Sequence, residues 1–251
     1  MICFEPDKSG YKISVLRIVI PTLMCIFNLF SIIHADEVII GKNTIDSMIF
    51  SPNPQARLGL ANGILKLYPS DTLWTVGTML KALEIELDST NSNIQEAGNS
   101  FSYTERIVRQ YIRNLESFGP TINDTLSALL NSQSEKFKNA IKIVLAKNSM
   151  ESVHHDVRNI LLNDSDPNFR GLAAVAITAY KDTSDILLLL KALNDPYTVT
   201  VALDYALPGQ NMTEIIHPVS EDAFWALKYG FGVLPDAKSP LGYKYIEKGP
   251  K

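Results

Sequence analysis

The sequence predicts an all-α fold, a solenoid of stacked helical hairpins followed by an irregular C-terminal arm. An Asp-Pro pair opens an apolar segment at Asp166-Pro167, and a second pair, Asp195-Pro196, opens another one 29 residues later. Apolar residues recur at helical spacing around these pairs, and the segments between them are short. A short helical unit that repeats is typical of a solenoid, because one hairpin cannot bury both of its faces alone.

The first predicted hairpin follows residues 36–50, which have mixed periodicity and form either a short strand or an extended lead-in. Two prolines in 51–54 suit the first turn of a helix, and apolar residues then recur at helical spacing as far as Tyr68. A second helix starts near Asp71 and carries an apolar stripe of Leu73, Val76, Leu80, Leu83 and Leu87.

The middle of the chain starts with a predicted linker near 88–100, which is rich in Ser and Asn and has little to bury. Ser102 and Glu105 then have the spacing of a capping box, in which each side chain bonds the backbone of the other residue. A shorter helix is expected around Leu126 to Leu130. A second capping box at 132–135 leads into the next helix.

The Asp-Pro units predict three further helices, over Pro167–Tyr180, Thr183–Asn194 and Pro196–Leu207. Proline is tolerated in a first helical turn because its missing amide donor is not needed there, while an aspartate before it can cap the exposed amides. Helices of this length joined by short loops leave no room for strands.

The segment Ser134–Leu207 resembles HEAT-type repeats, including the short HEAT-like variety also found in bilin-lyase relatives. A further match lies upstream, where Pro54 and Arg57 align with Pro167 and Arg170 at an offset of 113. In that family the Asp and Arg form a ladder between neighbouring repeats. The structural repeat positions implied by the resemblance are Pro54, Arg57, Asp166, Pro167, Arg170, Asp195 and Pro196.

The resemblance also has departures that make the ladder partial. Val199 stands at the position equivalent to Arg170, and Asn53 replaces the aspartate before Pro54. Arg57 and Arg170 could bind an anion, but their repeat positions favour a structural role, pairing with aspartates or capping carbonyls between stacked units.

The N-terminus has the layout of a secretory signal. Basic residues precede an apolar run from Ile18 to Ile33, and small and acidic residues follow it. The run is shorter than a membrane-spanning helix requires, so we expect a signal peptide over 1–35, with an uncleaved membrane anchor as the alternative. Both cysteines, Cys3 and Cys25, lie in this leader, so the exported chain is expected to have no disulfide framework.

The predicted organisation is a signal peptide over 1–35, a lead-in over 36–50, a HEAT-like helical-repeat domain over 51–217, and a cap helix with an irregular arm over 218–251. The formal net charge of -4 and the pI of about 5.6 argue against nucleic acid as a partner. We therefore expect a periplasmic or secreted protein that has no membrane association after signal cleavage.

Few residues in the sequence suggest chemistry. His154 and His155 are near Glu151 and Asp156, but the two imidazoles point about 100° apart on a helix, so an exposed polar face is favoured over a metal site. The aromatic residues Phe224, Trp225, Tyr229 and Phe231 could form a binding patch, but core or end-cap packing is favoured. No catalytic motif is recognisable, and neither a cofactor nor a metal is expected.

The function predicted on these grounds is an exported, non-enzymatic scaffold that binds a protein or peptide on the concave surface formed by the second helices of its hairpins. The expected groove residues are Thr75, Thr78, His155 and Arg158. Two alternatives stay open. One is an exported hydrolase or lyase with a carboxylate site between helices, and the other is a structural envelope or secretion-apparatus component.

Overall fold

The computed structural model describes residues 41–67, 70–88, 102–131, 134–202, 213–236 and 244–246. The chain divides into two units, Met1–Thr44 and Ile45–Lys251, and all the described residues except 41–44 lie in the second. The predicted signal peptide over 1–35 lies outside the described residues, as does all but the first residue of the predicted linker. None of the described helices combines the length and the apolar character that crossing a bilayer requires.

The described part of the chain is mainly helical, which confirms the all-α prediction at the level of fold class. Its ten α-helices are α2 (Lys42–Ile49), α3 (Pro54–Leu67), α4 (Thr72–Asp88), α5 (Tyr103–Glu116), α6 (Asn123–Leu129), α7 (Glu135–Lys147), α8 (His154–Asn163), α9 (Pro167–Ala176), α10 (Asp185–Ala192) and α11 (Pro218–Trp225). Short 3-10 segments η2 (Gly119–Ile122), η3 (Glu151–Val153) and η4 (Ile177–Tyr180) join several of them.

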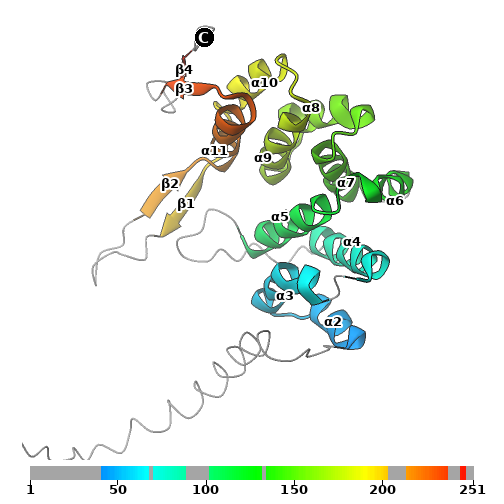
Figure 1. The fold of residues 1–251 in the computed structure, drawn as a ribbon. Helices are drawn as coiled ribbons and strands as arrows, with labels where there is room; N and C mark the ends of the chain where they lie inside the picture. The colour runs from blue at the N-terminus through cyan, green and yellow to red at the C-terminus, as the bar shows by residue number, and fades with distance from the viewer. Residues whose placement is uncertain are drawn as a thin grey trace, which may run out of the picture. The chain divides into compact units, whose positions relative to one another are not determined.

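Alternate helices pack on one another in chain order. Helix α3 packs on α5, α5 on α7, α7 on α9 and α9 on α11, as can be followed in Figure 1. The helices between them contact this row and each other, since α8 packs on both α7 and α10. Three of the largest fully buried side chains, Tyr111, Phe137 and Phe169, come from α5, α7 and α9, so the core follows the row.

Helix α2 corrects the expectation of a strand or an extended lead-in over 36–50 for the described part of that range, where residues 42–49 are helical. Its two buried residues, Ile45 and Ile49, are four positions apart and therefore lie on one side of a helix. The polar residues between them face solvent or are half-buried. This spacing is helical, but the apolar residues before Gly41 conceal it when the segment is taken as a whole.

The helix starts at Ser102 and Ser134 are capped by side chains. Ser102 accepts from the amide of Glu105 at 3.3 Å, and Glu105 accepts from the amide of Ser102 at 2.6 Å, which confirms the capping box. At the second site the cap is Ser134, which accepts from the amide of Phe137. The predicted box therefore begins two residues too early.

The two aligned segments at offset 113 have the same local geometry. Asn53 and Asp166 each accept a hydrogen bond at 2.9 Å from the amide two residues later. Arg57 donates to the carbonyl of Ser51 at 2.7 Å, and Arg170 donates to the carbonyl of Asp164 at 2.8 Å, six residues earlier in both cases. The asparagine thus replaces the aspartate as a cap with no change of local structure.

Each of these arginines also binds a carboxylate from further along the chain. Arg57 pairs with the buried Glu86 at the end of α4. Arg170 forms two hydrogen bonds to Asp195, at 2.7 and 2.8 Å. The hydrogen bonds to Asp195 raise the pKa of the Arg170 guanidinium, so the guanidinium stays charged. The arginine positions therefore join the start of one helix to the end of the following one.

The helix predicted over Pro196–Leu207 is absent from the described part of this range. Residues Val199–Ala202 form strand β1, which pairs antiparallel with β2 (Thr213–Ile216). The Asp195 carboxylate accepts from the amide of Tyr197 at 3.0 Å, the same bond that Asp166 forms at the start of α9, but residues 199–202 continue as a strand. Four of the five residues after Tyr197 are β-branched, and these favour a strand.

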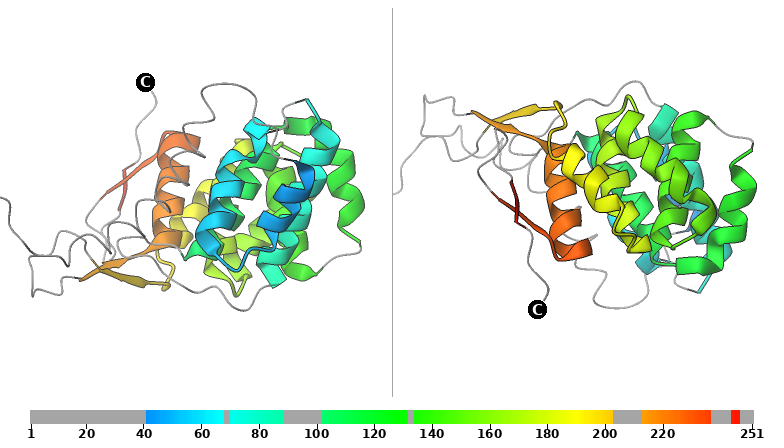
Figure 2. Two further views of the ribbon diagram at one scale, coloured as in Figure 1. Left: turned by 90° about the horizontal axis from the view of Figure 1, so that it is seen from below. Right: turned by 90° about the horizontal axis from the view of Figure 1, so that it is seen from above.

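The C-terminal part contains α11, which starts at Pro218, followed by a π-helical turn, η5 (Ala226–Phe231), and a second hairpin of β3 (Leu234–Asp236) and β4 (Lys244–Ile246). Figure 2 shows the orange helix α11 beside the yellow-green helices. A Cβ on Gly171 of α9 would overlap the Asp222 carboxylate of α11, which is bound at 2.8 Å to Arg109 of α5. Glycine therefore allows α9, α11 and this ion pair to come together.

Candidate functional site

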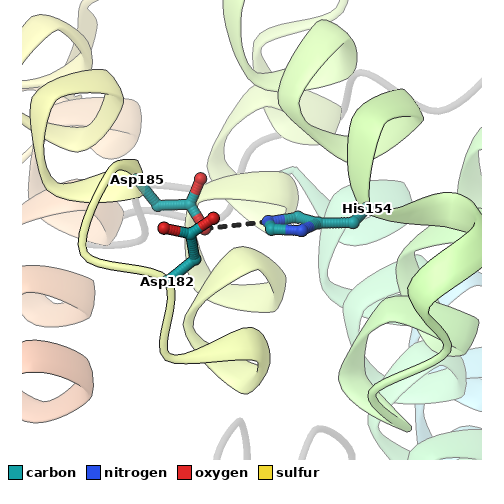
Figure 3. Close-up of side chains that lie close together, drawn as sticks. All are labelled: His154, Asp182 and Asp185. Carbon is teal, nitrogen blue, oxygen red and sulfur yellow. Dashed lines mark hydrogen bonds and ion pairs between the residues drawn. The ribbon is translucent and has the colours of Figure 1, made fainter.

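A cluster of polar residues joins the start of α8 to the start of α10. His154 is the first residue of α8, Asp185 is the first residue of α10, and Asp182 lies in the loop before it. His154 Nε2 lies 2.9 Å from Asp185 Oδ2, and the Asp182 carboxylate lies beside that pair, as Figure 3 shows. Asp185 is fully buried, so this carboxylate depends on its protein partners for solvation.

Arg158 binds both carboxylates of the cluster. Its Nε donates to Asp185 Oδ1 at 2.6 Å, and its Nη2 donates to Asp182 Oδ2 at 2.7 Å. Burial opposes the charge of Arg158, but its hydrogen bonds to Asp185 and Asp182 outweigh this and raise its pKa. Hydrogen bonds from Ser184, and then the charge of Arg158, lower the pKa of Asp182.

The His154 ring is also fixed from its face. The Tyr180 ring stacks on it with centroids 3.8 Å apart, and the Tyr180 hydroxyl donates to the carbonyl of Met150 at 2.8 Å. Burial, followed by the negative charges of Glu151 and Asp185, raises the pKa of Tyr180. The tyrosine therefore stays neutral at physiological pH and holds η4 against the start of α8.

The cluster offers three potential metal ligands, because one atom each of His154, Asp182 and Asp185 lie within 4.8 Å of one another. All four carboxylate oxygens already accept hydrogen bonds or face the imidazole: two bind Arg158, one faces His154, and Asp182 Oδ1 accepts from the amide of Ser184. A cation would have to displace the guanidinium that supplies the positive charge. The donor set therefore fits a joint between helices better than a metal centre.

The four predicted groove residues differ in their exposure to solvent. Thr75 and Thr78 are 1% and 7% exposed on α4, so they do not line an accessible groove, and this part of the prediction is corrected. His155 is exposed, whereas Arg158 is half-buried and bound to Asp182 and Asp185. Only His155 is thus both accessible and without a role in the polar cluster.

The expectation of an exposed polar face for both histidines is also corrected. His154 is buried and bonded to a different helix, and only His155 faces solvent. Asp182 and Asp185 are not among the residues predicted from the sequence. A usable signal existed, since Arg57 and Arg170 have their carboxylate partners 29 and 25 residues later, and Asp185 lies 27 residues after Arg158.

A second candidate is the surface formed by Trp225, Lys228 and Tyr229, called the aromatic surface below. Trp225 is 45% exposed and Tyr229 is 72% exposed. Their rings are parallel to within 7°, with centroids 5.4 Å apart. The Lys228 ammonium lies 4.9 Å from the Trp225 centroid and 5.2 Å from the Tyr229 centroid, a cation–π geometry.

For the segment formed by α11 and η5, the end-cap interpretation holds on one side and fails on the other. Ala223, Ala226 and Leu227 are buried against the neighbouring helices, as an end cap requires. Trp225 and Tyr229 point away from that core and are accessible. The segment therefore caps the helices on one face and presents aromatic side chains on the other.

The protein is mainly helical and has two distinctive groups of side chains. The polar cluster of α8 and α10 forms its hydrogen bonds within the protein, whereas the rings of the aromatic surface are exposed to solvent. Comparison of the chain with models of known protein families, with curated proteins and with solved structures found no match to any of them. The function is therefore argued from the residues of the chain itself.

Proposed function

We propose that the protein is an exported stack of HEAT-like helical hairpins that binds another protein through the aromatic surface. Two features support the stack. The helices α3, α5, α7, α9 and α11 pack in chain order, and the geometry around Arg57 recurs around Arg170. In such a stack each unit is stabilised by its neighbours, which leaves the outer surfaces available for a partner.

The observation that carries the binding role is the exposure of the parallel Trp225–Tyr229 pair. Tryptophan and tyrosine are enriched among the residues that dominate binding energy at protein interfaces. They supply a large contact area with little side-chain entropy to lose, and here their mutual stacking orders them before binding. An exposed pair of this kind has no evident role in folding.

Other exposed apolar side chains support this function less well. Phe50, Leu73 and Leu187 are each more than half exposed, but none has an aromatic ring stacked on it. Single apolar residues on a surface are normal and need no functional explanation. The aromatic surface differs because it combines two ordered rings with a cation.

Binding is favoured over catalysis because the polar cluster of α8 and α10 is bonded to itself. Both residues of the His154–Asp185 pair are held by other protein groups. Among the described residues, the ring nitrogens of His154 face the carboxylates of Glu151 and Asp185 and not a hydroxyl or thiol that could act as a nucleophile. Export rests on the predicted signal peptide, so the proposed partner is another exported or surface protein.

The proposal is tested by site-specific photo-crosslinking in the native compartment. A photo-crosslinking amino acid at Tyr229 should capture a discrete partner, while the same amino acid at Leu73, which is also exposed, should not. Equal crosslinking from both positions, or from neither, would remove the aromatic surface as a binding site. Size-exclusion chromatography of the isolated chain distinguishes a reversible scaffold from a permanently assembled component.

A further inference from the structure

The aromatic surface carries positive charge that the described part of the chain leaves unbalanced. We infer that it binds an acidic peptide segment of the partner, with carboxylates beside an apolar side chain. This inference rests on the proposed function and names the chemistry of the partner. It follows from the surroundings of two lysines, Lys228 and Lys181.

Lys228 contacts aromatic rings and, among the described residues, no carboxylate. Besides Trp225 and Tyr229, its ammonium lies 6.0 Å from the Phe224 centroid. Cation–π contacts position an ammonium without neutralising its charge. Lys228 is therefore held between exposed rings with its charge available to a partner's carboxylate.

Lys181 brings a second ammonium to the same segment. It ends η4 in a left-handed conformation, with a φ of 56°. Its ammonium donates to the carbonyl of Gly230 at 2.8 Å, and Gly230 follows Tyr229 directly in the chain. A carbonyl accepts the hydrogen bond but leaves the positive charge uncompensated.

These surroundings differ from those of four other lysines, which pair with carboxylates: Lys81 with Asp46, Lys138 with Glu135, Lys142 with Asp156, and Lys147 with Glu116. The chain as a whole carries a net charge of -4. A local positive charge on an acidic protein steers and orients an acidic partner, because potentials across an interface are complementary.

The number of charges favours a peptide over a membrane. Segments that bind anionic lipid surfaces typically combine about four to eight basic residues. Here two ammonium groups accompany two aromatic rings, which fits the size of a short peptide with one apolar side chain between carboxylates.

The test uses the full chain with Trp74→Phe, so that Trp225 is the one remaining tryptophan and reports binding by its fluorescence. The probe is a short synthetic peptide in which glutamates alternate with leucine and phenylalanine. Its control replaces the glutamates with glutamine. We expect the acidic peptide to bind, with an affinity that falls as salt is added, and the glutamine peptide to bind at least about fivefold more weakly.

Variants assign the effect to the two lysines. Lys228→Gln and Lys181→Gln should each weaken binding of the acidic peptide by about two- to fivefold, the range of an exposed ion pair. Lys136→Gln removes a charge from an exposed position on α7 and should leave the affinity unchanged.

Three results would overturn the inference. They are equal affinity for the two peptides, equal affinity of the lysine variants and the parent chain, and binding to phosphatidylglycerol vesicles with no binding to the acidic peptide. If photo-crosslinking from Tyr229 still captures a partner in any of these cases, the binding surface stands and only its charge preference is wrong.

Discussion

At the scale of single residues, Arg57 and Arg170 show how a repeated sequence position determines a repeated structure. Both donate to a carbonyl six residues earlier, and both bind a carboxylate near the end of the following helix. Their guanidinium groups are largely buried, so each depends on that carboxylate for compensation of its charge. Removal of one partner leaves the other buried and unpaired.

Replacement of Arg170 by alanine should therefore be costly. We expect Arg170→Ala to lower the free energy of unfolding by about 3 kcal/mol, since Asp195 loses its ion pair and the carbonyl of Asp164 loses its donor. Urea denaturation measures the change. The control Lys138→Ala breaks a solvent-exposed pair with Glu135 and should cost less than about 0.5 kcal/mol. Similar losses for both variants would contradict a structural role for Arg170.

Tyr111 makes stability sensitive to alkaline pH. Burial, followed by the negative charge of Glu86, raises its pKa in the folded protein. Above the ordinary tyrosine pKa the unfolded chain releases this proton and the folded protein keeps it, so the free energy of unfolding falls as pH rises, by about 1.4 kcal/mol for each pH unit.

Chemical denaturation at several alkaline pH values tests this dependence. In Tyr111→Phe the fall should be shallower, because the group that releases the proton is absent. Tyr229→Phe, at an exposed position, is the matched control and should keep the slope of the parent chain. An unchanged slope in Tyr111→Phe would show that another group is responsible.

The residue scale also shows what the sequence could reveal about the polar cluster and what it could not. The positions of Arg57 and Arg170 follow from a repeat, which is visible in the sequence. Thr75 and Thr78 are predicted as groove residues from the pattern of one helix alone. Their burial depends on which neighbouring helices cover that helix. The same limit applies to His154, whose partner Asp185 is 31 residues away.

At the scale of elements, helix starts were predicted well and the strand β1 was not. A cap such as Ser102 acts within a few residues, so its signal is local. Asp195-Pro196 has the same local signal as Asp166-Pro167, and each aspartate accepts from the amide two residues later, but the Asp195 carboxylate also binds Arg170. Tertiary contacts and β-branched residues thus decide a segment whose first two residues favour a helix.

Glycines inside α3 give a test at this scale. Gly59 and Gly63 lie in the helix interior, and a Cβ at either position would meet no atom within 4 Å. Gly59→Ala and Gly63→Ala should each raise the free energy of unfolding by about 0.5 to 1 kcal/mol, because alanine loses less backbone entropy in a helix. Thermal and urea denaturation measure the gain.

The matched control for these variants is Gly171→Ala, because Gly171 lies in α9 and contacts α11. There the added Cβ would overlap the Asp222 carboxylate and disturb its pair with Arg109, so this variant should be less stable than the parent chain. If all three substitutions stabilise the protein, the close approach of α9 and α11 is described wrongly.

At the scale of the whole molecule, the helices of residues 45–251 form a row that ends in a segment with two different faces. One face of α11 and η5 is buried against α9 and α10, and the other presents Trp225 and Tyr229. The pattern of apolar residues predicts helices that pack on one another, but it does not predict which side chains remain exposed on the last one. For this reason the sequence indicated the class of fold, but for the aromatic residues of the proposed binding surface it favoured packing over binding.

The proposed function requires that a partner protein binds through the aromatic surface. The decisive measurement is the affinity of the crosslinked partner for the double variant Trp225→Ala/Tyr229→Ala. Loss of two dominant interface side chains should weaken the complex by about thirtyfold or more, measured as the dissociation constant. The melting temperature should change little, and the control Phe50→Ala/Leu73→Ala should bind as the parent chain does, since its exposed residues lie on other elements. Unchanged affinity of a correctly folded double variant would contradict the account.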